Sequence, residues 1–110
     1  MGVAAALLLA AGCFPAGDGS GSFSVHHSDP FLTCVREHES GGNYGAVSPG
    51  GQYRGAYQFL QSTWDATARH IGASDQVGVD PSTASPTLQD DMAWALYQWQ
   101  GTGPWAGDGC

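Results

Sequence analysis

The sequence contains no lysine and only three arginines, against ten aspartates and glutamates, which gives a formal net charge of −7 at pH 7. Binding to nucleic acid rests on neutralising phosphates with lysine and arginine, and attraction to an anionic membrane surface rests on the same side chains. We therefore expect no nucleic-acid partner and no electrostatic attraction to membranes. A neutral or sugar-like ligand, held by aromatic and amide side chains, suits this composition better.

Cysteine is scarce as well, since the 110 residues include only Cys13, Cys34 and Cys110. A chain of this length makes one domain at most, with tails, and its 42% of hydrophobic residues suffice for a core. If Cys13 is lipidated or removed, Cys34 and Cys110 remain as a pair in an oxidising compartment. Their bridge would stabilise the domain by roughly 4 to 5 kcal/mol in the chain-entropy model. The alternative is a buried thiol at Cys34 and a frayed terminal thiol at Cys110.

The N-terminus has a short apolar run, Val3 to Ala11, with no lysine or arginine before it. The run is too short to span a bilayer as a helix and is typical of an export signal. The residues from Ala10 to Cys13 look like a bacterial lipobox, in which the cysteine becomes lipidated. We predict residues 1–13 to be a signal peptide or lipoprotein signal, and the protein to be secreted or extracytoplasmic. Two outcomes stay open for Cys13: a lipid anchor to the membrane, or loss with a cleaved signal.

The rest of the chain divides into a linker, 14–28, which is rich in glycine and serine, and a domain, 29–110. Within the domain, apolar residues at helical spacing predict three helices that begin near Asp29, Ser62 and Ser85. Glycines at 41, 72 and 101 end them. Short extended pieces between the first two helices predict a small hairpin. The fold class is therefore mainly α.

Glu39 is one of only two glutamates and continues the apolar stripe of Phe31 and Val35 to the end of the first helix. The partial negative charge of a helix C-terminus disfavours an ionised carboxylate, and partial burial does the same by desolvation. Both effects raise the pKa. A carboxylic acid that stays neutral near pH 7 is what a general acid needs, as in glycoside cleavage.

No second carboxyl is obvious from the sequence. Most glycosidases use two carboxyl groups on either side of the bond that is cleaved, but Glu37 faces away from Glu39 on the same helix. The other acids considered lie near predicted helix starts: Asp65, Asp90 and Asp91. Glu39 is thus expected to work alone or with groups of the substrate. No nucleophilic triad or metal site is indicated, and His26, His27 and His70 are interpreted as solvated or packing residues.

Three motifs follow in order: Glu39 to Tyr44 (ESGGNY), Tyr53 to Phe59 (YRGAYQF) and Gln61 to Trp64 (QSTW). With the tail from Gln100 to Trp105, they resemble the transglycosylase-like domain of resuscitation-promoting factors, which are secreted actinobacterial proteins related to lysozyme and to soluble lytic transglycosylases. The resemblance implies a lysozyme-like α+β fold, in which a short hairpin or loop region lines a glycan cleft and one disulfide closes the domain.

The same resemblance implies an enzyme that cleaves peptidoglycan between N-acetylmuramic acid and N-acetylglucosamine, with Glu39 as general acid and base. Both a lytic transglycosylase and a muramidase remain open. Tyr53 and Trp99 offer aromatic faces for sugar rings. The full set of predicted substrate-binding residues is Ser40, Asn43, Tyr53, Tyr57, Gln58, Trp99 and Gln100. We expect a monomer without metal or cofactor, with peptidoglycan glycan strands as its partner.

One departure from the family pattern concerns the residue before the acid. The family usually has a cysteine there, whereas this chain has His38 and places Cys34 one helical turn earlier. A bridge can persist with a shifted partner.

The alternative reading is a catalytically inactive lipoprotein that binds peptidoglycan or signals from it.

Overall fold

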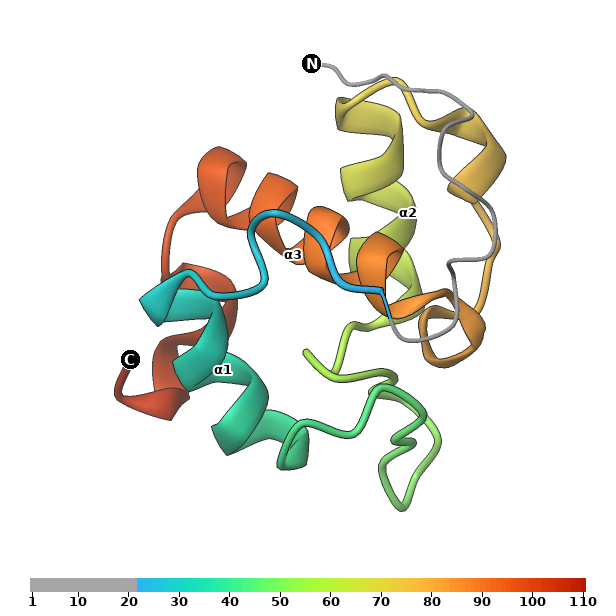
Figure 1. Cartoon of the computed structure of the whole chain (residues 1–110). Coiled ribbons are helices and arrows are strands. Elements are labelled where there is room, and N and C mark those ends of the chain that lie inside the picture. The colour runs from blue at the N-terminus through green and yellow to red at the C-terminus, as the bar shows by residue number, and fades with distance from the viewer. Residues whose placement is uncertain (1–21) are drawn as a thin grey trace.

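A computed structural model describes residues 22–110, and its regular structure is almost entirely helical (Figure 1). The elements, in chain order, are α1 (Pro30–Ser40), α2 (Gln61–His70), η2 (Ser74–Gln76), η3 (Pro81–Thr83), α3 (Pro86–Gln100) and η4 (Gly103–Asp108). Among these residues, β-structure is limited to two isolated bridges, in which Arg54 pairs with Val47 and with Phe59. The mainly helical fold class is confirmed, and the predicted hairpin is reduced to this bridged loop.

The first and third α-helices, α1 and α3, each begin directly after the capping residue that the sequence indicates. The Asp29 side chain accepts hydrogen bonds from the backbone N–H groups of Phe31 and Leu32 at the start of α1. The Ser85 hydroxyl accepts from the N–H of Leu88 at the start of α3. These bonds satisfy donors that a helix N-terminus otherwise leaves without a partner. The helix α2 has no side-chain cap.

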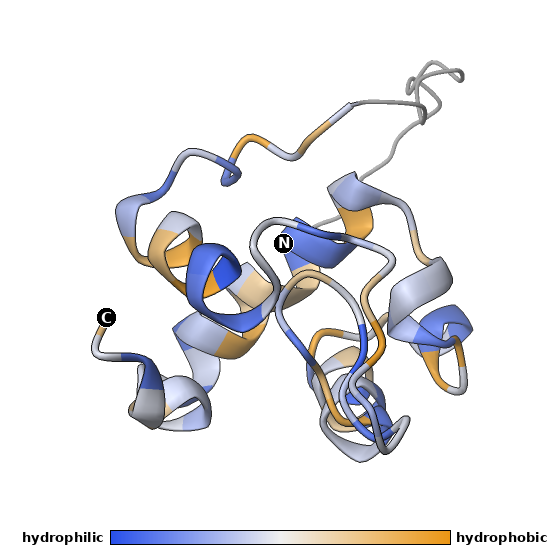
Figure 2. Ribbon diagram, turned by 90° about the horizontal axis from the view of Figure 1, so that it is seen from below, coloured by the Kyte–Doolittle hydropathy of each residue, from blue (hydrophilic) through white to orange (hydrophobic). Residues whose placement is uncertain are grey.

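The core is built largely from aromatic side chains. Trp64 is fully buried, and its ring meets Phe59 edge to face at 5.1 Å between centroids. Trp105, from η4, contributes a third ring next to Phe59 and donates its indole N–H to the backbone carbonyl of Tyr57. Hydrophobic and hydrophilic residues alternate along the helices, as expected where one face of each helix is buried (Figure 2).

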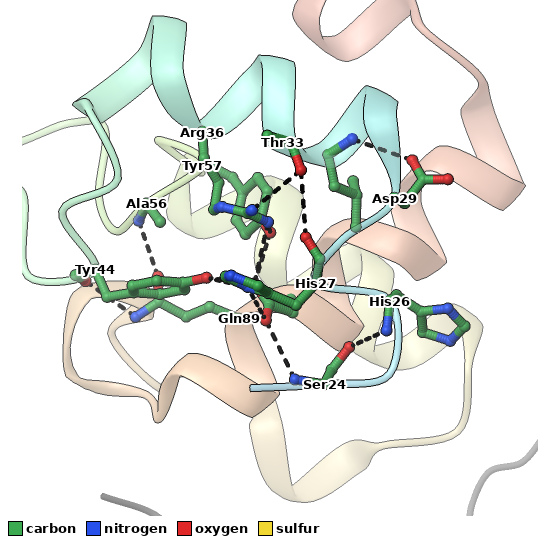
Figure 3. Close-up of polar contacts among 12 residues, drawn as sticks. Ser24, His26, His27, Asp29, Thr33, Arg36, Tyr44, Ala56, Tyr57 and Gln89 are labelled. Carbon is green, nitrogen blue, oxygen red and sulfur yellow. Dashed lines mark hydrogen bonds and ion pairs between the residues drawn. The ribbon is translucent and has the colours of Figure 1, made fainter. Parts of the chain in front are cut away.

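A buried carboxylate, Asp90, ties separate parts of the chain together. Figure 3 shows its partners Tyr44, Tyr57, His27 and Arg36, which lie close together. Its Oδ1 accepts hydrogen bonds of 2.6 Å from the hydroxyls of both Tyr44 and Tyr57. Its Oδ2 lies 3.0 Å from Nδ1 of His27, and the guanidinium of Arg36 lies 3.8 Å from Oδ1. The cluster therefore connects α3 with α1, with the loop before α2 and with the segment that precedes α1.

That preceding segment, residues 22–28, is the part of the predicted linker that the structure describes, and it packs against α3. His26 stacks on Trp94 of α3 with 4.2 Å between ring centroids, and Phe23 stacks on His27 at 3.9 Å. Aromatic rings that lie flat on one another bury apolar area, so these residues belong to the folded unit. The two histidines are therefore packing residues, one of the two interpretations that the sequence left open.

The Cys34–Cys110 disulfide is present and is confirmed as predicted, with 5.9 Å between the Cα atoms. It joins the middle of α1 to Cys110, two residues after the end of η4. The predicted signal, Cys13 and the first part of the linker lie outside the described residues. None of the helices that the structure describes combines the length and the apolar character needed to cross a membrane.

Candidate active site

Glu39 lies in the last turn of α1, one residue before the helix ends. Gly41 follows in the left-handed conformation, with φ of 65°, and its N–H donates to the carbonyl of Glu37. The N–H of Gly42 donates to the carbonyl of Arg36. This glycine pair turns the chain sharply away from the helix axis, so the partly exposed Glu39 side chain stands at a helix terminus.

The environment raises the pKa of Glu39 from 4.5 to about 7. Desolvation is the largest cause, followed by a side-chain hydrogen bond with Asp108 and by the repulsive charge of the same residue. Each of these favours the protonated carboxyl. Near neutral pH, Glu39 therefore exists as a mixture of acid and carboxylate, and it can both give and take a proton.

Asp108 is the carboxyl named among these causes, and it is not one of the acids considered from the sequence. It is the last residue of η4, and it lies two residues before the bridged Cys110. Sequence reasoning missed it because 69 positions separate it from Glu39 along the chain. The signal that could have found it is the disulfide itself, since a bridge from Cys110 to Cys34 brings the C-terminal residues to α1.

Ser40 and Asn43, both predicted to bind substrate, organise the turn after Glu39. The Ser40 hydroxyl donates to the carbonyl of Ala56 at 2.8 Å and accepts from the N–H of Asn43 at 3.0 Å. The Asn43 side-chain oxygen accepts from the N–H of Gly45. Ser40 thus fastens the end of α1 to the loop before α2, while the Asn43 side chain stays exposed beside it.

The loop before α2 carries three more predicted contacts. Tyr53 is 44% exposed and presents a free aromatic surface. Gln58 has a positive φ of 54°, an unusual conformation for a residue with a side chain, and its Nε2 donates to the carbonyl of Gly55. Backbone strain of this kind often accompanies functional positions. Tyr57, in contrast, is fully buried.

The prediction of Tyr57 as a substrate contact is therefore wrong. Its hydroxyl accepts a hydrogen bond from Arg36 Nη1 at 2.8 Å and donates to Asp90. Burial and the nearby Asp90 carboxylate raise the pKa of Tyr57 far above its ordinary value. A side chain with no exposed surface and a complete set of partners belongs to the core.

Trp99 and Gln100 lie in the last turn of α3. Trp99 is 39% exposed and stacks on His70 of α2 with 4.1 Å between ring centroids. It lines a groove of about 840 Å³ whose walls include His70 and Met92, but not Glu39. Gln100 is exposed. The predicted aromatic platform at Trp99 therefore belongs to the wall of this groove.

Within residues 22–110, one group of side chains has the spacing of a metal site: Cys34, His38 and Cys110, whose ligand atoms lie within 4.8 Å of one another. The two sulfurs are bonded to each other, so neither is a thiolate that could bind a metal. This cluster therefore offers a metal only the exposed His38 ring.

Comparison with known proteins places these residues in a family. The model of the transglycosylase-like domain matches residues 28–107, so the chain belongs to that family. It is also similar to proteins named "Probable transglycosylase SceD" from Staphylococcus aureus. Identity to the protein of strain MRSA252 is 43% over 82 residues, which cover 74% of this chain and 33% of the relative. Identity to the protein of strain Mu3 / ATCC 700698 is 44% over 74 residues, which cover 67% of this chain and 30% of the relative. The chain thus spans about a third of these relatives, and no solved structure matches it.

Proposed function

We propose that this domain cleaves the glycan strands of peptidoglycan, at the bond between N-acetylmuramic acid and N-acetylglucosamine. The observation that carries the proposal is the state of Glu39, a partly exposed carboxyl with a pKa of about 7 at the end of α1. Membership of the transglycosylase-like family supports the glycosidic substrate. The exposed Tyr53 and the strained Gln58 supply candidate sugar contacts. Both lie on the loop that connects α1 to α2.

In the proposed reaction, the protonated Glu39 carboxyl donates its proton to the glycosidic oxygen. The bond from that oxygen to C1 of the muramyl sugar breaks, and the departing sugar leaves as an alcohol. The resulting carboxylate then takes the proton of the group that attacks C1. In a lytic transglycosylase this group is the muramyl 6-hydroxyl, which gives a 1,6-anhydro end, and in a muramidase it is water. A pKa near the working pH lets one residue serve in both steps.

An extracytoplasmic location and an anchor at Cys13 are parts of the proposal that follow from the substrate and the predicted signal. The narrower assignment to actinobacterial resuscitation-promoting factors stays a prediction, since the relatives reported above are staphylococcal.

The test is mass spectrometry of the fragments that the protein releases from purified peptidoglycan, compared with Glu39→Gln. Glu39→Gln keeps the size and hydrogen-bonding capacity of the side chain but cannot give up a proton in this way. We expect a loss of activity of at least about 100-fold. The matched control is Glu37→Gln, which changes an exposed glutamate of the same helix.

The end groups decide the reaction class. Glu39-dependent anhydro ends indicate a lytic transglycosylase, and Glu39-dependent reducing ends indicate a muramidase. Binding to insoluble peptidoglycan with no released fragments would instead favour the inactive binding lipoprotein, and equal activity of Glu39→Gln would remove Glu39 from the mechanism.

A further inference from the structure

We propose that Cys34, Cys110 and His38 form a binding site for one Zn²⁺ ion, or for a similar divalent cation that prefers sulfur ligands, once the disulfide between the two cysteines is reduced. The inference goes beyond the proposed function and does not depend on it. The domain then has two alternative cross-links between α1 and the residues after η4. One is the disulfide, under oxidising conditions, and the other is a metal bridge, under reducing conditions.

The first observation is the spacing of the three ligand atoms. The sulfurs of Cys34 and Cys110 and a ring nitrogen of His38 all lie within 4.8 Å of one another. In a tetrahedral zinc site such atoms are roughly 3.6 to 3.8 Å apart, because Zn–S bonds are about 2.3 Å long and Zn–N bonds about 2.0 Å. His38 follows Cys34 by four residues, so both side chains lie on one face of α1. Rotations about side-chain bonds therefore suffice to place all three ligands around one ion.

The second observation is that the packing of the domain does not use His38. The other three histidines each stack on an aromatic ring: His26 on Trp94, His27 on Phe23 and His70 on Trp99. Among residues 22–110, no hydrogen bond and no ring stacking holds the His38 side chain, which is exposed. Neutral imidazole is a common zinc ligand. An imidazole without a structural contact, one helical turn from a cysteine, is available for that role.

The third observation is access and charge. Cys110 and His38 are exposed and Cys34 is partly exposed, so a reductant and a metal ion can both reach the cluster from solvent. Exposed disulfides are among the more easily reduced ones. The chain has a net charge of −7 and no lysine, and Arg36, the nearest arginine in sequence, is directed to Asp90. The electrostatic field of the protein therefore favours a cation here.

The proposed exchange balances in electrons and protons. Two molecules of a thiol reductant supply two electrons and two protons: the bond between Cys34 and Cys110 breaks, two cysteine thiols form, and the reductant leaves as its own disulfide. Zn²⁺ then binds both sulfurs as thiolates together with the neutral His38 ring, and the two thiol protons pass to water. A water molecule completes the tetrahedron, as it does in other zinc sites with three protein ligands.

The experiment uses Co²⁺ as a coloured probe for the site and Zn²⁺ as its competitor. Every protein is the full chain with Cys13→Ser, so that Cys34 and Cys110 are the only cysteines. The disulfide is reduced without air by a phosphine, which takes up oxygen from water and leaves no competing thiol. Co²⁺ is titrated into the oxidised protein, the reduced protein and the reduced His38→Gln variant, and absorption is recorded from the ultraviolet to the red.

We expect the reduced protein to bind one Co²⁺ with thiolate-to-cobalt charge-transfer absorption and with the intense visible bands of tetrahedral cobalt. Zn²⁺ should remove both signals, and the oxidised protein should show neither. His38→Gln should weaken Co²⁺ binding by at least about 10-fold, since even the loss of a group that only supports a ligand costs this much. The matched control is His70→Gln, which changes an exposed histidine of α2 and should leave the affinity unchanged.

Circular dichroism shows whether the reduced domain stays folded. If reduction unfolds it, Zn²⁺ should restore the helical signal of the reduced protein but not that of a variant with Cys34→Ser, because metal binding and folding are coupled. The proposal is overturned if the reduced protein gives no thiolate-to-cobalt absorption, if His38→Gln binds Co²⁺ as tightly as its parent, or if the reduced chain stays unfolded with Zn²⁺. Each of these outcomes is independent of activity on peptidoglycan.

Discussion

Tyr57 and Asp90, 33 residues apart in the chain, are joined by a hydrogen bond of 2.6 Å in which the tyrosine hydroxyl donates to Oδ1. Neither side chain has exposed surface. Through this bond the loop that carries Gln58 is fastened to α3, and Ser40 fastens the same loop to the end of α1 through Ala56. The surroundings of Glu39 therefore depend on a buried polar cluster as well as on the apolar core.

Asp90→Asn tests the strength of that cluster. The change removes the charge that balances the buried Arg36. It also replaces one acceptor oxygen with an N–H₂ donor, which faces either the two tyrosine hydroxyls at Oδ1 or the Ser24 N–H and His27 Nδ1 at Oδ2. Breaking a buried ion pair by removing one partner costs about 3–5 kcal/mol. We expect this loss in the free energy of unfolding, measured by urea denaturation, and a change below about 0.5 kcal/mol for the exposed Asp75→Asn. Equal stability of the two variants would contradict the role of Asp90.

The elements with local signals could be predicted from the sequence. The capping residues Asp29 and Ser85 and the glycines that follow the helices mark α1 and α3, because these contacts span only a few residues. The Asp90 cluster and the effect of Asp108 on the pKa of Glu39 could not be predicted, because they involve residues far apart in the chain. Asp90 shows the difficulty: an acid near a predicted helix start has an adequate local explanation in the sequence, which hides its long-range role, although α3 has no acid in its first turn.

Gly55 is expected to tolerate no side chain. Its φ is +85°, and a Cβ built on it would lie 2.5 Å from Oε1 of Gln89, the atom that accepts a hydrogen bond from the N–H of Ala56. We expect Gly55→Ala to lower the free energy of unfolding by more than about 2 kcal/mol. Gly78 has the same positive φ, +86°, but nothing within 4 Å, so Gly78→Ala measures the backbone strain alone. Equal losses in the two variants would show that the contact with Gln89 is unimportant.

The disulfide should make a large contribution to stability. The bridged cysteines are 76 positions apart, and closing a loop of this length stabilises a fold by roughly 4 to 5 kcal/mol in the chain-entropy model. Reducing agent should therefore lower Tm by at least about 10 °C in a domain of this size. The variant carrying both Cys34→Ser and Cys110→Ser should reproduce the lower Tm and no longer respond to reductant. A Tm that is the same with and without reductant would contradict the prediction.

Ionisation of Glu39 should lower the free energy of unfolding as pH rises. Its pKa is about 7 in the folded protein against 4.5 for the free group, so between these values the folded state binds more protons than the unfolded state. The free energy of unfolding contributed by Glu39 is then fully present below pH 4.5 and is lost as pH rises through 7. Glu39→Gln removes this dependence. We expect the variant to match the wild type at pH 4 and to exceed it in stability at pH 8, in urea denaturation followed by tryptophan fluorescence. Glu37→Gln is the matched control. The prediction is contradicted if the stability difference between Glu39→Gln and the wild type does not change with pH, because the pKa of Glu39 is then not raised in the folded protein.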